Sequence, residues 1–257
     1  MINNIPLIAF LLFFSLSAKP DIQILSSDNN SKYSGRAVII IDDLGNQYKP
    51  CLPLIRSKYP ITLSILPACP FSRKIAEEGH VLGHEIILHA PMESWDNASN
   101  RRELKFDNRF LTTAMEPEEL TVVLESMIRS IPHIMGISNH MGSKFTEDSI
   151  KMEVVIRALK DKKLCFVDSR TSKDSKGFML ANKHGVASVE RQIFLDNDQT
   201  YEGTVDQLSN LMRMGNKKGY AVGIGHPYPT TIRALLDMMP NFKENNVEIV
   251  PLSEMLD

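Results

Sequence analysis

Two adjacent acids, Asp42 and Asp43, directly follow a run of five apolar residues at positions 37–41. Such a run is typical of a buried strand in a parallel sheet, and it would present both carboxylates at the C-terminal end of that strand. Parallel α/β proteins build their sites at this end. Because neighbouring carboxylates repel each other, the pair indicates a cation close by. The pattern favours a divalent metal ion combined with a catalytic proton.

Four later segments repeat this design, in which an apolar run ends in a polar side chain. The polar residues are His89, His140, Asp168 and His226. Imidazole and carboxylate groups bind zinc-like ions and move protons near neutral pH. Packing does not readily explain five strand ends that carry Asp, His, His, Asp and His, so we expect these ends to meet at one site.

Polar neighbours of the two central histidines extend the candidate site. Glu93 follows His89 by four residues, a spacing at which both side chains could hold one ion. Asn139 immediately precedes His140, and Gly142 after it permits a close approach of the backbone. A turn with a surface histidine would also fit this second pattern.

The last two strand ends offer an arginine and an aromatic ring. Arg170 follows Asp168 by two residues, either as a structural ion pair or as a clamp that orients another carboxylate. Tyr228 follows His226 in a proline-bounded loop, where it could stack on a sugar ring or only anchor the loop. Such a rigid loop suits a histidine that donates a proton. The other histidines, His80, His84, His133 and His184, flank turns and helix ends and are interpreted as structural or solvated.

Composition limits the class of protein. The 257 residues are 43% hydrophobic, enough for one α/β domain of barrel size. The net charge of −2 gives no electrostatic basis for binding nucleic acid. Three cysteines exclude a disulfide framework, although Cys51 and Cys69 could pair.

The N-terminal residues differ from the rest of the chain. Residues 5–16 are almost wholly apolar, and small residues follow before Lys19. This length fits a secretory signal, so residues 1–18 are predicted to be a signal peptide, with an uncleaved membrane tether as the alternative. Residues 19–35 are polar and read as a linker.

From residue 36 to 257, strands and helices alternate without an interior linker, which predicts one domain with a parallel sheet. A closed barrel would bring the polar strand ends together, whereas an open sheet would spread them along an edge. The segment Glu93–Thr113 is long and polar, as expected of a functional loop. Strands are expected at 61–66 and 247–250, and helices at 72–78, 117–130 and 149–160, around 205–212 and around 232–239.

Five motifs resemble those of the divergent polysaccharide deacetylase family, a branch of the NodB-homology carbohydrate esterases. They occur in the family's order and cover essentially all of residues 36–256. The motifs are 41–45 (Ile-Asp-Asp-Leu-Gly), 83–93 (Gly-His-Glu-Ile-Ile-Leu-His-Ala-Pro-Met-Glu), 139–143 (Asn-His-Met-Gly-Ser), 166–171 (Phe-Val-Asp-Ser-Arg-Thr) and 224–227 (Ile-Gly-His-Pro).

The resemblance implies a distorted (β/α) barrel, usually of seven strands, with a divalent metal at its C-terminal face. In the wider superfamily the first acid of the pair is the general base and the second a metal ligand, which maps onto Asp42 and Asp43. His226 resembles the general acid. Arg170 resembles the arginine that orients the base, either directly or through Asp168.

The resemblance leaves two ligand sets open. Glu93 replaces the family's second ligand histidine, four residues after His89. His140 occupies a motif that differs from the superfamily pattern. The metal, with zinc as the expected ion, is therefore held by Asp43, His89 and either His140 or Glu93, and His140 is the favoured choice. In that case Glu93 bonds substrate or a ligand histidine.

The function expected from the resemblance is metal-dependent hydrolysis of acetyl groups on an N-acetylated polysaccharide or cell-envelope glycan, at an amide bond that is not a peptide bond. The expected partner is a glycan, without nucleic acid and without a membrane domain beyond the N-terminal tether, and the location is secreted or periplasmic. The alternatives are a catalytically lapsed barrel that binds glycan or a protein partner, and a metal hydrolase for a different bond.

Overall fold

The computed structural model describes residues 33–106 and 109–256. The predicted signal peptide and most of the predicted linker lie outside these ranges. The first strand begins at Gly35, one residue before the expected start of the domain. In the described part of the chain, no helix combines the length and the apolar character needed to cross a membrane.

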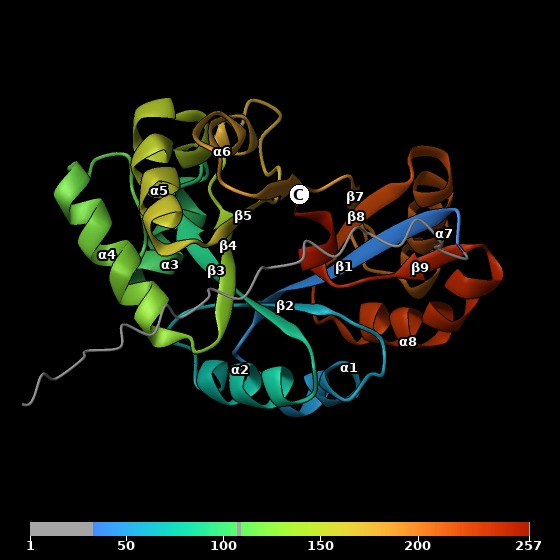
Figure 1. The fold of residues 1–257 in the computed structure, drawn as a ribbon. Helices are drawn as coiled ribbons and strands as arrows, with labels where there is room; N and C mark the ends of the chain where they lie inside the picture. The colour runs from blue at the N-terminus through green and yellow to red at the C-terminus, as the bar shows by residue number, and fades with distance from the viewer. Residues whose placement is uncertain (1–32, 107–108, 257) are drawn as a thin grey trace, which may run out of the picture. The chain divides into compact units, whose positions relative to one another are not determined.

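Within the described ranges, nine parallel strands form one sheet (Figure 1). Its order is β6-β5-β4-β3-β2-β1-β8-β7, and β9 pairs with β1. The strands are β1 (Gly35–Leu44), β2 (Thr62–Ile65), β3 (Glu85–Met92), β4 (Ile134–Met141), β5 (Cys165–Asp168), β6 (Ser188–Glu190), β7 (Ile193–Phe194), β8 (Tyr220–Gly225) and β9 (Val247–Ile249).

The segment from β6 to β7 closes the sheet into a distorted barrel, which confirms the predicted fold class. β6 pairs with β5, β7 pairs with β8, and only Arg191 and Gln192 separate the two strands. The Gln192 N–H donates to the carbonyl of Val222 at 3.0 Å, so the segment reaches β8 before β7 begins. The count is nine instead of seven because this strand is divided and because β9 occupies the edge of β1 ahead of β2.

Helices cover the outside of the barrel (Figure 1). α2 continues to Val81, three residues beyond the predicted end at residue 78, and so includes Gly79. A Cβ at this glycine would lie 2.4 Å from Leu63, so the glycine serves close helix–sheet packing. The helices are α1 (Leu52–Ile55), α2 (Ser72–Val81), α3 (Asn97–Phe106), α4 (Pro117–Ser130), α5 (Ser149–Lys162), α6 (Gly177–His184), α7 (Tyr201–Lys218) and α8 (Pro229–Glu244), with 3-10 turns at Lys49–Cys51, Phe145–Glu147 and Leu252–Met255.

Side chains of β1 alternate between two apolar layers. Val38 and Ile40 belong to a small cluster that includes residues of β3, β5 and β8 and fills the barrel. Ala37, Ile39 and Ile41 belong to a larger cluster between the sheet and the helices. Since successive strand residues face opposite sides, position along a strand decides which polar residues enter the barrel at its C-terminal end.

His84 is a buried structural histidine that joins the segment before β2 to α1. It is 3% exposed, its Nδ1 accepts from the Ile61 N–H at 3.3 Å, and its Nε2 lies 2.8 Å from the carbonyl of Ile55. A carbonyl only accepts hydrogen bonds, so Nε2 carries the proton and the ring is neutral. Burial lowers the pKa of His84, and its two backbone hydrogen bonds only partly oppose this effect.

We expect the His84→Gln variant to be less sensitive to acid than the wild type. A lowered folded-state pKa means that the unfolded chain binds this proton first, so wild-type stability is full above about pH 6.5 and falls below it. At pH 8 the free energy of unfolding of the variant should be about 1 kcal/mol lower than that of the wild type, because a backbone hydrogen bond is lost. Between pH 7 and pH 5 the urea midpoint of the variant should change less than that of the wild type. An equal change of the urea midpoint with pH in the two proteins would contradict this prediction.

Candidate metal centre

The five strand-end residues named from the sequence all lie at the C-terminal end of the parallel sheet. Asp42 lies in β1, His89 in β3, His140 in β4 and Asp168 in β5, and His226 follows β8 directly. The structure brings four of them together around Asp43. Asp168 remains outside this group, because its side chain faces the helices.

A β-bulge allows both adjacent acids to face the same site. The register of β1 against β2 gains one residue between Ile41 and Leu44, and Asp43 has a φ of 58°. In a regular strand the two side chains would point to opposite faces. Asp42 continues the inward-facing series of Val38 and Ile40, and the bulge with its left-handed residue turns Asp43 toward the same end of the barrel.

Asp43, His89 and His140 form a cluster with the geometry of a metal site. Asp43 Oδ1 lies 2.8 Å from His140 Nδ1 and 3.2 Å from His89 Nε2. One ligand atom from each residue lies within 4.8 Å of the other two. One carboxylate and two imidazoles on three neighbouring strand ends can therefore reach a single point.

The hydrogen bonding of Asp43 shows that this cluster fits a divalent cation. Asp43 Oδ1 is buried and faces the ring nitrogens of His140 and His89, but no well-aligned hydrogen bond from a described residue satisfies it. A buried carboxylate oxygen in this situation calls for an ion or water that the two imidazoles can share with it. Burial raises the pKa of Asp43, but the neighbouring His140 and His89 outweigh it, so the pKa lies well below its usual value and the group is anionic. Two imidazoles and a carboxylate, with a free position for water, form a zinc-type set.

Two buried serines orient His89. Its Nδ1 lies 2.7 Å from Ser138 Oγ, and Ser138 Oγ lies 2.9 Å from Ser64 Oγ. Both serines are fully buried inside the barrel. With Nδ1 bonded to Ser138, His89 presents Nε2 to Asp43, which is the arrangement required of an imidazole ligand whose second nitrogen is held by the protein.

We expect Ser138→Ala to lower the affinity for zinc about tenfold or more, the usual effect of removing a partner of a ligand histidine. Ser64→Ala is the matched control, because it removes the next hydroxyl and leaves the bond to His89. Its effect should be smaller. Competition titration against a zinc chelator measures both values, and an unchanged affinity in Ser138→Ala would show that this bond does not orient the ligand.

Asp42 lies beside the cluster with one oxygen unpaired. It is 3% exposed, and its Oδ1 is 3.5 Å from His89 Nδ1 but has no hydrogen-bond partner among the described residues. The position is inside the barrel end, next to Asp43. A carboxylate with a free oxygen there can accept a proton from a water molecule.

The guanidinium of Arg170, predicted to orient the base, faces a different region. Its Nε lies 3.4 Å from Glu190, and its Nη atoms donate to the carbonyls of Ser175 and Lys173 at 3.4 and 3.3 Å. These contacts tie the arginine to the loop after β5. The structure shows no contact of its guanidinium with Asp42 in the described ranges.

Arg191 is the arginine whose charge acts on Asp42, and sequence reasoning missed it. Its Nε donates to the carbonyl of Ser169 at 2.7 Å, and its Nη2 donates to the carbonyl of Arg170 at 2.8 Å. Burial lowers the pKa of Arg191, while the charges of Asp168 and Asp42 act in the opposite direction. In the sequence, Arg191 directly follows the short strand β6, and no motif of polar residues draws attention to that position.

Asp168 and Asn139 serve the backbone instead of the site. Asp168 accepts hydrogen bonds from Ser175 Oγ at 2.7 Å and the Phe178 N–H at 3.0 Å, next to the start of α6. Asn139 accepts from the Ser169 N–H at 2.9 Å and so links β4 to the end of β5. Both residues occupy positions on their strands that face away from the barrel interior.

Glu93, the alternative ligand, already has partners for both carboxylate oxygens. Oε1 lies 2.7 Å from Lys144 Nζ, and Oε2 accepts from the N–H and Oγ1 of Thr113 at 2.8 and 2.7 Å. Burial raises the pKa of Glu93, but the bonds to Lys144 and Thr113 outweigh burial, so the pKa lies below its usual value. Glu93 thus clamps the two ends of the segment 93–113, and this geometry favours His140 as the third ligand.

His226 is held by Asp196, a second residue that sequence reasoning did not assign to the site. His226 Nδ1 lies 3.0 Å from Asp196 Oδ1, and its backbone N–H donates to Asp196 Oδ2 at 2.6 Å. His226 Nε2 lies 3.8 Å from Asp43 Oδ2. Burial lowers the pKa of His226, but the bond to Asp196 and the charges of Asp43, Asp196 and Asp42 outweigh it and raise the pKa above 6.5. The position of Asp196 directly after the apolar residues 194 and 195 was the sequence signal that could have identified it.

Two cavities meet at Asp43. The larger, about 650 Å³, extends past His140 toward α3. The smaller, about 190 Å³, is lined by His226, Tyr228 and Cys51. The Tyr228 ring is tilted against that of His226, with 5.6 Å between centroids. The described cysteines form no disulfide bond, so the possible Cys51–Cys69 disulfide is not formed.

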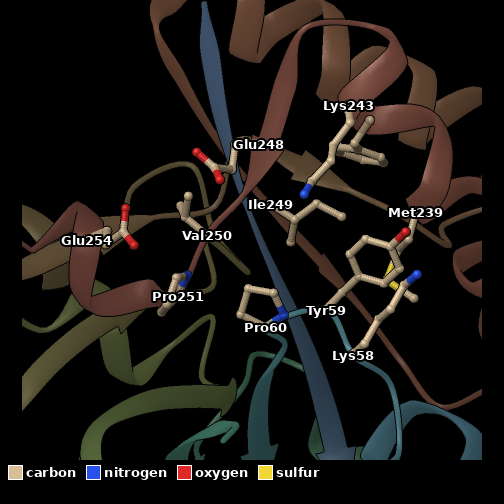
Figure 2. A pocket seen from close by; sticks show the side chains of 11 residues that line it. Lys58, Tyr59, Pro60, Met239, Lys243, Glu248, Ile249, Val250, Pro251 and Glu254 are labelled. Atoms are coloured by element: carbon tan, nitrogen blue, oxygen red, sulfur yellow. The ribbon is translucent and has the colours of Figure 1, made fainter. Parts of the chain in front are cut away.

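A separate hollow of about 490 Å³ lies at the opposite end of the barrel (Figure 2). Lys58 and Lys243 are on one side of it and Glu248 and Glu254 on the other, around the beginning of β2 and the short β9. The described residues that line it include no histidine, cysteine or aspartate. It therefore lacks a zinc-type ligand set.

Comparison with known proteins gives consistent matches. A model of the divergent polysaccharide deacetylase family matches residues 39–256. The uncharacterized protein YibQ of Escherichia coli K12 is 29% identical over 224 residues, 87% of this chain and 68% of YibQ. The crystal structure of an uncharacterized protein of Agrobacterium tumefaciens C58 has a TM-score of 0.81 at 21% identity, covering 88% of this chain and 90% of the other. A mutant of a CE4 family pseudoenzyme with restored enzymatic activity has a TM-score of 0.52 at 15% identity, covering 87% and 68%.

Proposed function

The chain belongs to the divergent polysaccharide deacetylase family, and on that premise we propose that it is a metal-dependent hydrolase that removes acetyl groups from an N-acetylated polysaccharide or cell-envelope glycan. One observation carries the proposal. The unpaired carboxylate oxygen of Asp42 lies 3.5 Å from His89, and the imidazole of His226 lies 3.8 Å from Asp43, so both groups adjoin the ligand cluster. These are the groups that hydrolysis of an amide requires on the two sides of the reacting carbonyl.

Asp43, His89 and His140 would hold the ion, and zinc suits their donor atoms. When bound, a divalent ion supplies a Lewis acid that polarises the acetyl carbonyl and makes water a better nucleophile. His89 would be kept in the correct orientation by Ser138.

Asp42 acts as the general base and takes a proton from the attacking water. Its free Oδ1 is buried next to the ligand cluster, where few waters compete for it. Arg191 lies near enough for the charge of Asp42 to act on its guanidinium, so it places a positive charge in the neighbourhood of the base.

His226 acts as the general acid and donates a proton from Nε2 to the departing amine. Asp196 accepts from Nδ1, which fixes the orientation of the ring and leaves Nε2 toward Asp43. The raised pKa of His226, in which the bond to Asp196 and nearby acids outweigh burial, keeps this proton available near neutral pH.

The two cavities at Asp43 would divide the substrate between them. The larger one offers room for a glycan chain, and the smaller one, closed by Pro227 and Tyr228, suits the acetyl group. A glycan of the cell envelope would be met in the secreted or periplasmic location that the N-terminal segment predicts.

The competing proposal is a binding protein on the same barrel, and the CE4 pseudoenzyme among the structural neighbours gives it a specific basis. A lapsed enzyme is expected to lose its base, its acid or its ligands. This chain keeps Asp42, Asp43 and His226, and although Glu93 replaces the family's second ligand histidine, His140 and His89 both lie against Asp43. Catalysis is therefore the better explanation.

Acetate release from N-acetylated envelope glycans by the zinc-loaded chain tests the proposal. We expect release from at least one glycan, its loss on treatment with a chelator, and its recovery when zinc is added back. Glycan binding without acetate release at any metal loading would favour the binding protein instead.

A further inference from the structure

The larger cavity at the metal centre contains one cation, Arg102, among its described lining residues. Asp43 and His140 form its base and belong to the candidate metal centre. The remaining lining side chains carry no charge, and several of them, such as Leu66 and Pro67, are apolar. If Asp43 is engaged with the ion, Arg102 is the principal charge that a ligand meets farther out in this cavity.

Arg102 is carried on a helix that is tied to the end of β3. Asn100, which is 6% exposed, accepts from the Ser94 N–H at 2.8 Å and donates to the Ser94 carbonyl at 2.6 Å. At the start of the helix, Asp96 accepts from the Ala98 N–H at 2.9 Å. These bonds tie α3 to Ser94, two residues after the end of the strand that carries His89, so Arg102 has a defined place beside the centre.

The charge of Arg102 is available to a ligand. Within 33–102 and 109–256, no hydrogen bond or ion pair of its guanidinium is found. Its acidic neighbour Asp96 is engaged at the helix start, where the Ser99 hydroxyl and the Ala98 and Ser99 N–H groups are its partners. The hydrogen bond from Ser99 is the main cause of the lowered pKa of Asp96, and Arg102 contributes least.

We infer that the larger cavity selects N-acetylated glycans that bear a carboxylate close to the acetamido group, and that Arg102 binds this carboxylate. The inference rests on the proposed function and names its substrate class. A guanidinium matches a carboxylate with two parallel hydrogen bonds, and Arg102 is exposed, so its charge can reach a ligand in the cavity. The same charge disfavours glycans rich in free amines.

Calorimetric titration of the zinc-loaded full chain tests this. The probes are a disaccharide of N-acetylglucosamine and N-acetylmuramic acid and the methyl ester of the same disaccharide, which has the same shape without the charge. We expect the acid to bind about tenfold more tightly than the ester, as a charge-assisted hydrogen bond provides. Arg102→Gln should bring the two affinities together by weakening only the acid. Arg101→Gln, on the same helix but outside the cavity lining, is the matched control and should behave as the wild type.

Equal affinities of the wild type for acid and ester, or a preference that persists in Arg102→Gln, would overturn the inference, as would absence of binding by both compounds. The titrations need no turnover. A charge preference without acetate release from any glycan would thus count against the proposed function and leave the role of Arg102 standing. Acetate release without a charge preference would support the proposed function and overturn the role of Arg102.

Discussion

Replacing Asp43 by asparagine is expected to remove the bound metal and the deacetylase activity together. Asp43 is the residue that the two imidazoles share, with His140 at 2.8 Å and His89 at 3.2 Å from the same oxygen. An amide lacks the negative charge that holds a cation between two neutral histidines. Zinc affinity should fall by more than about 100-fold, since loss of even an outer-shell partner costs 10–100-fold. Chelator competition and acetate release measure the two losses.

Asp237→Asn provides the control for this substitution, because it changes the same group on α8, in contact with Arg233 and Tyr201 and away from the cluster. It should keep both zinc and turnover. The far-ultraviolet circular dichroism of Asp43→Asn should match the wild type, which separates a lost ligand from a lost fold. An Asp43→Asn protein that bound zinc as the wild type does would remove Asp43 from the ligand set.

Replacing Asp42 by asparagine should separate chemistry from metal binding. Asp42 lies next to the cluster, but the ligand atoms that converge come from Asp43, His89 and His140. The variant should therefore bind zinc like the wild type. Its kcat should fall by about 100-fold or more, the usual contribution of a general base.

Unchanged acetate release by Asp42→Asn would show that another group takes the proton from water. Loss of zinc together with turnover would instead place Asp42 among the ligands. Arg191→Lys refines the interpretation, because it keeps the charge near Asp42 but cannot reproduce both backbone bonds of the guanidinium. It should lower kcat less than Asp42→Asn does.

The parallel sheet and the end at which the site lies could be predicted from sequence because apolar runs and the polar residues after them mark parallel strands. Which of those polar residues enter the barrel depends on the two-residue period of each strand. Asp168 has the parity of Phe166, which packs toward the helices, and His89 has the parity of Ile87, which fills the barrel. Sequence position already contained this distinction.

Other parts of the site could not be predicted because they depend on irregular backbone and on long-range contacts. The bulge that turns Asp43 inward reverses the parity rule for that one residue. The charges of Arg191 and Asp42 act on each other because the chain passes from β6 to β7 at the closure of the barrel. Asp196 reaches His226 across 30 residues of chain. Only Asp196, which directly follows the apolar residues 194 and 195, leaves a local signal in the sequence, and that signal does not identify its partner.

Metal analysis of His140→Ala beside the wild type tests the central claim most directly, because the alternative ligand Glu93 is already bonded to Lys144 and Thr113. After zinc loading and removal of loosely bound ions, we predict one zinc per chain in the wild type and a near-complete loss in the variant. A variant that retained one zinc per chain would contradict the ligand set of Asp43, His89 and His140.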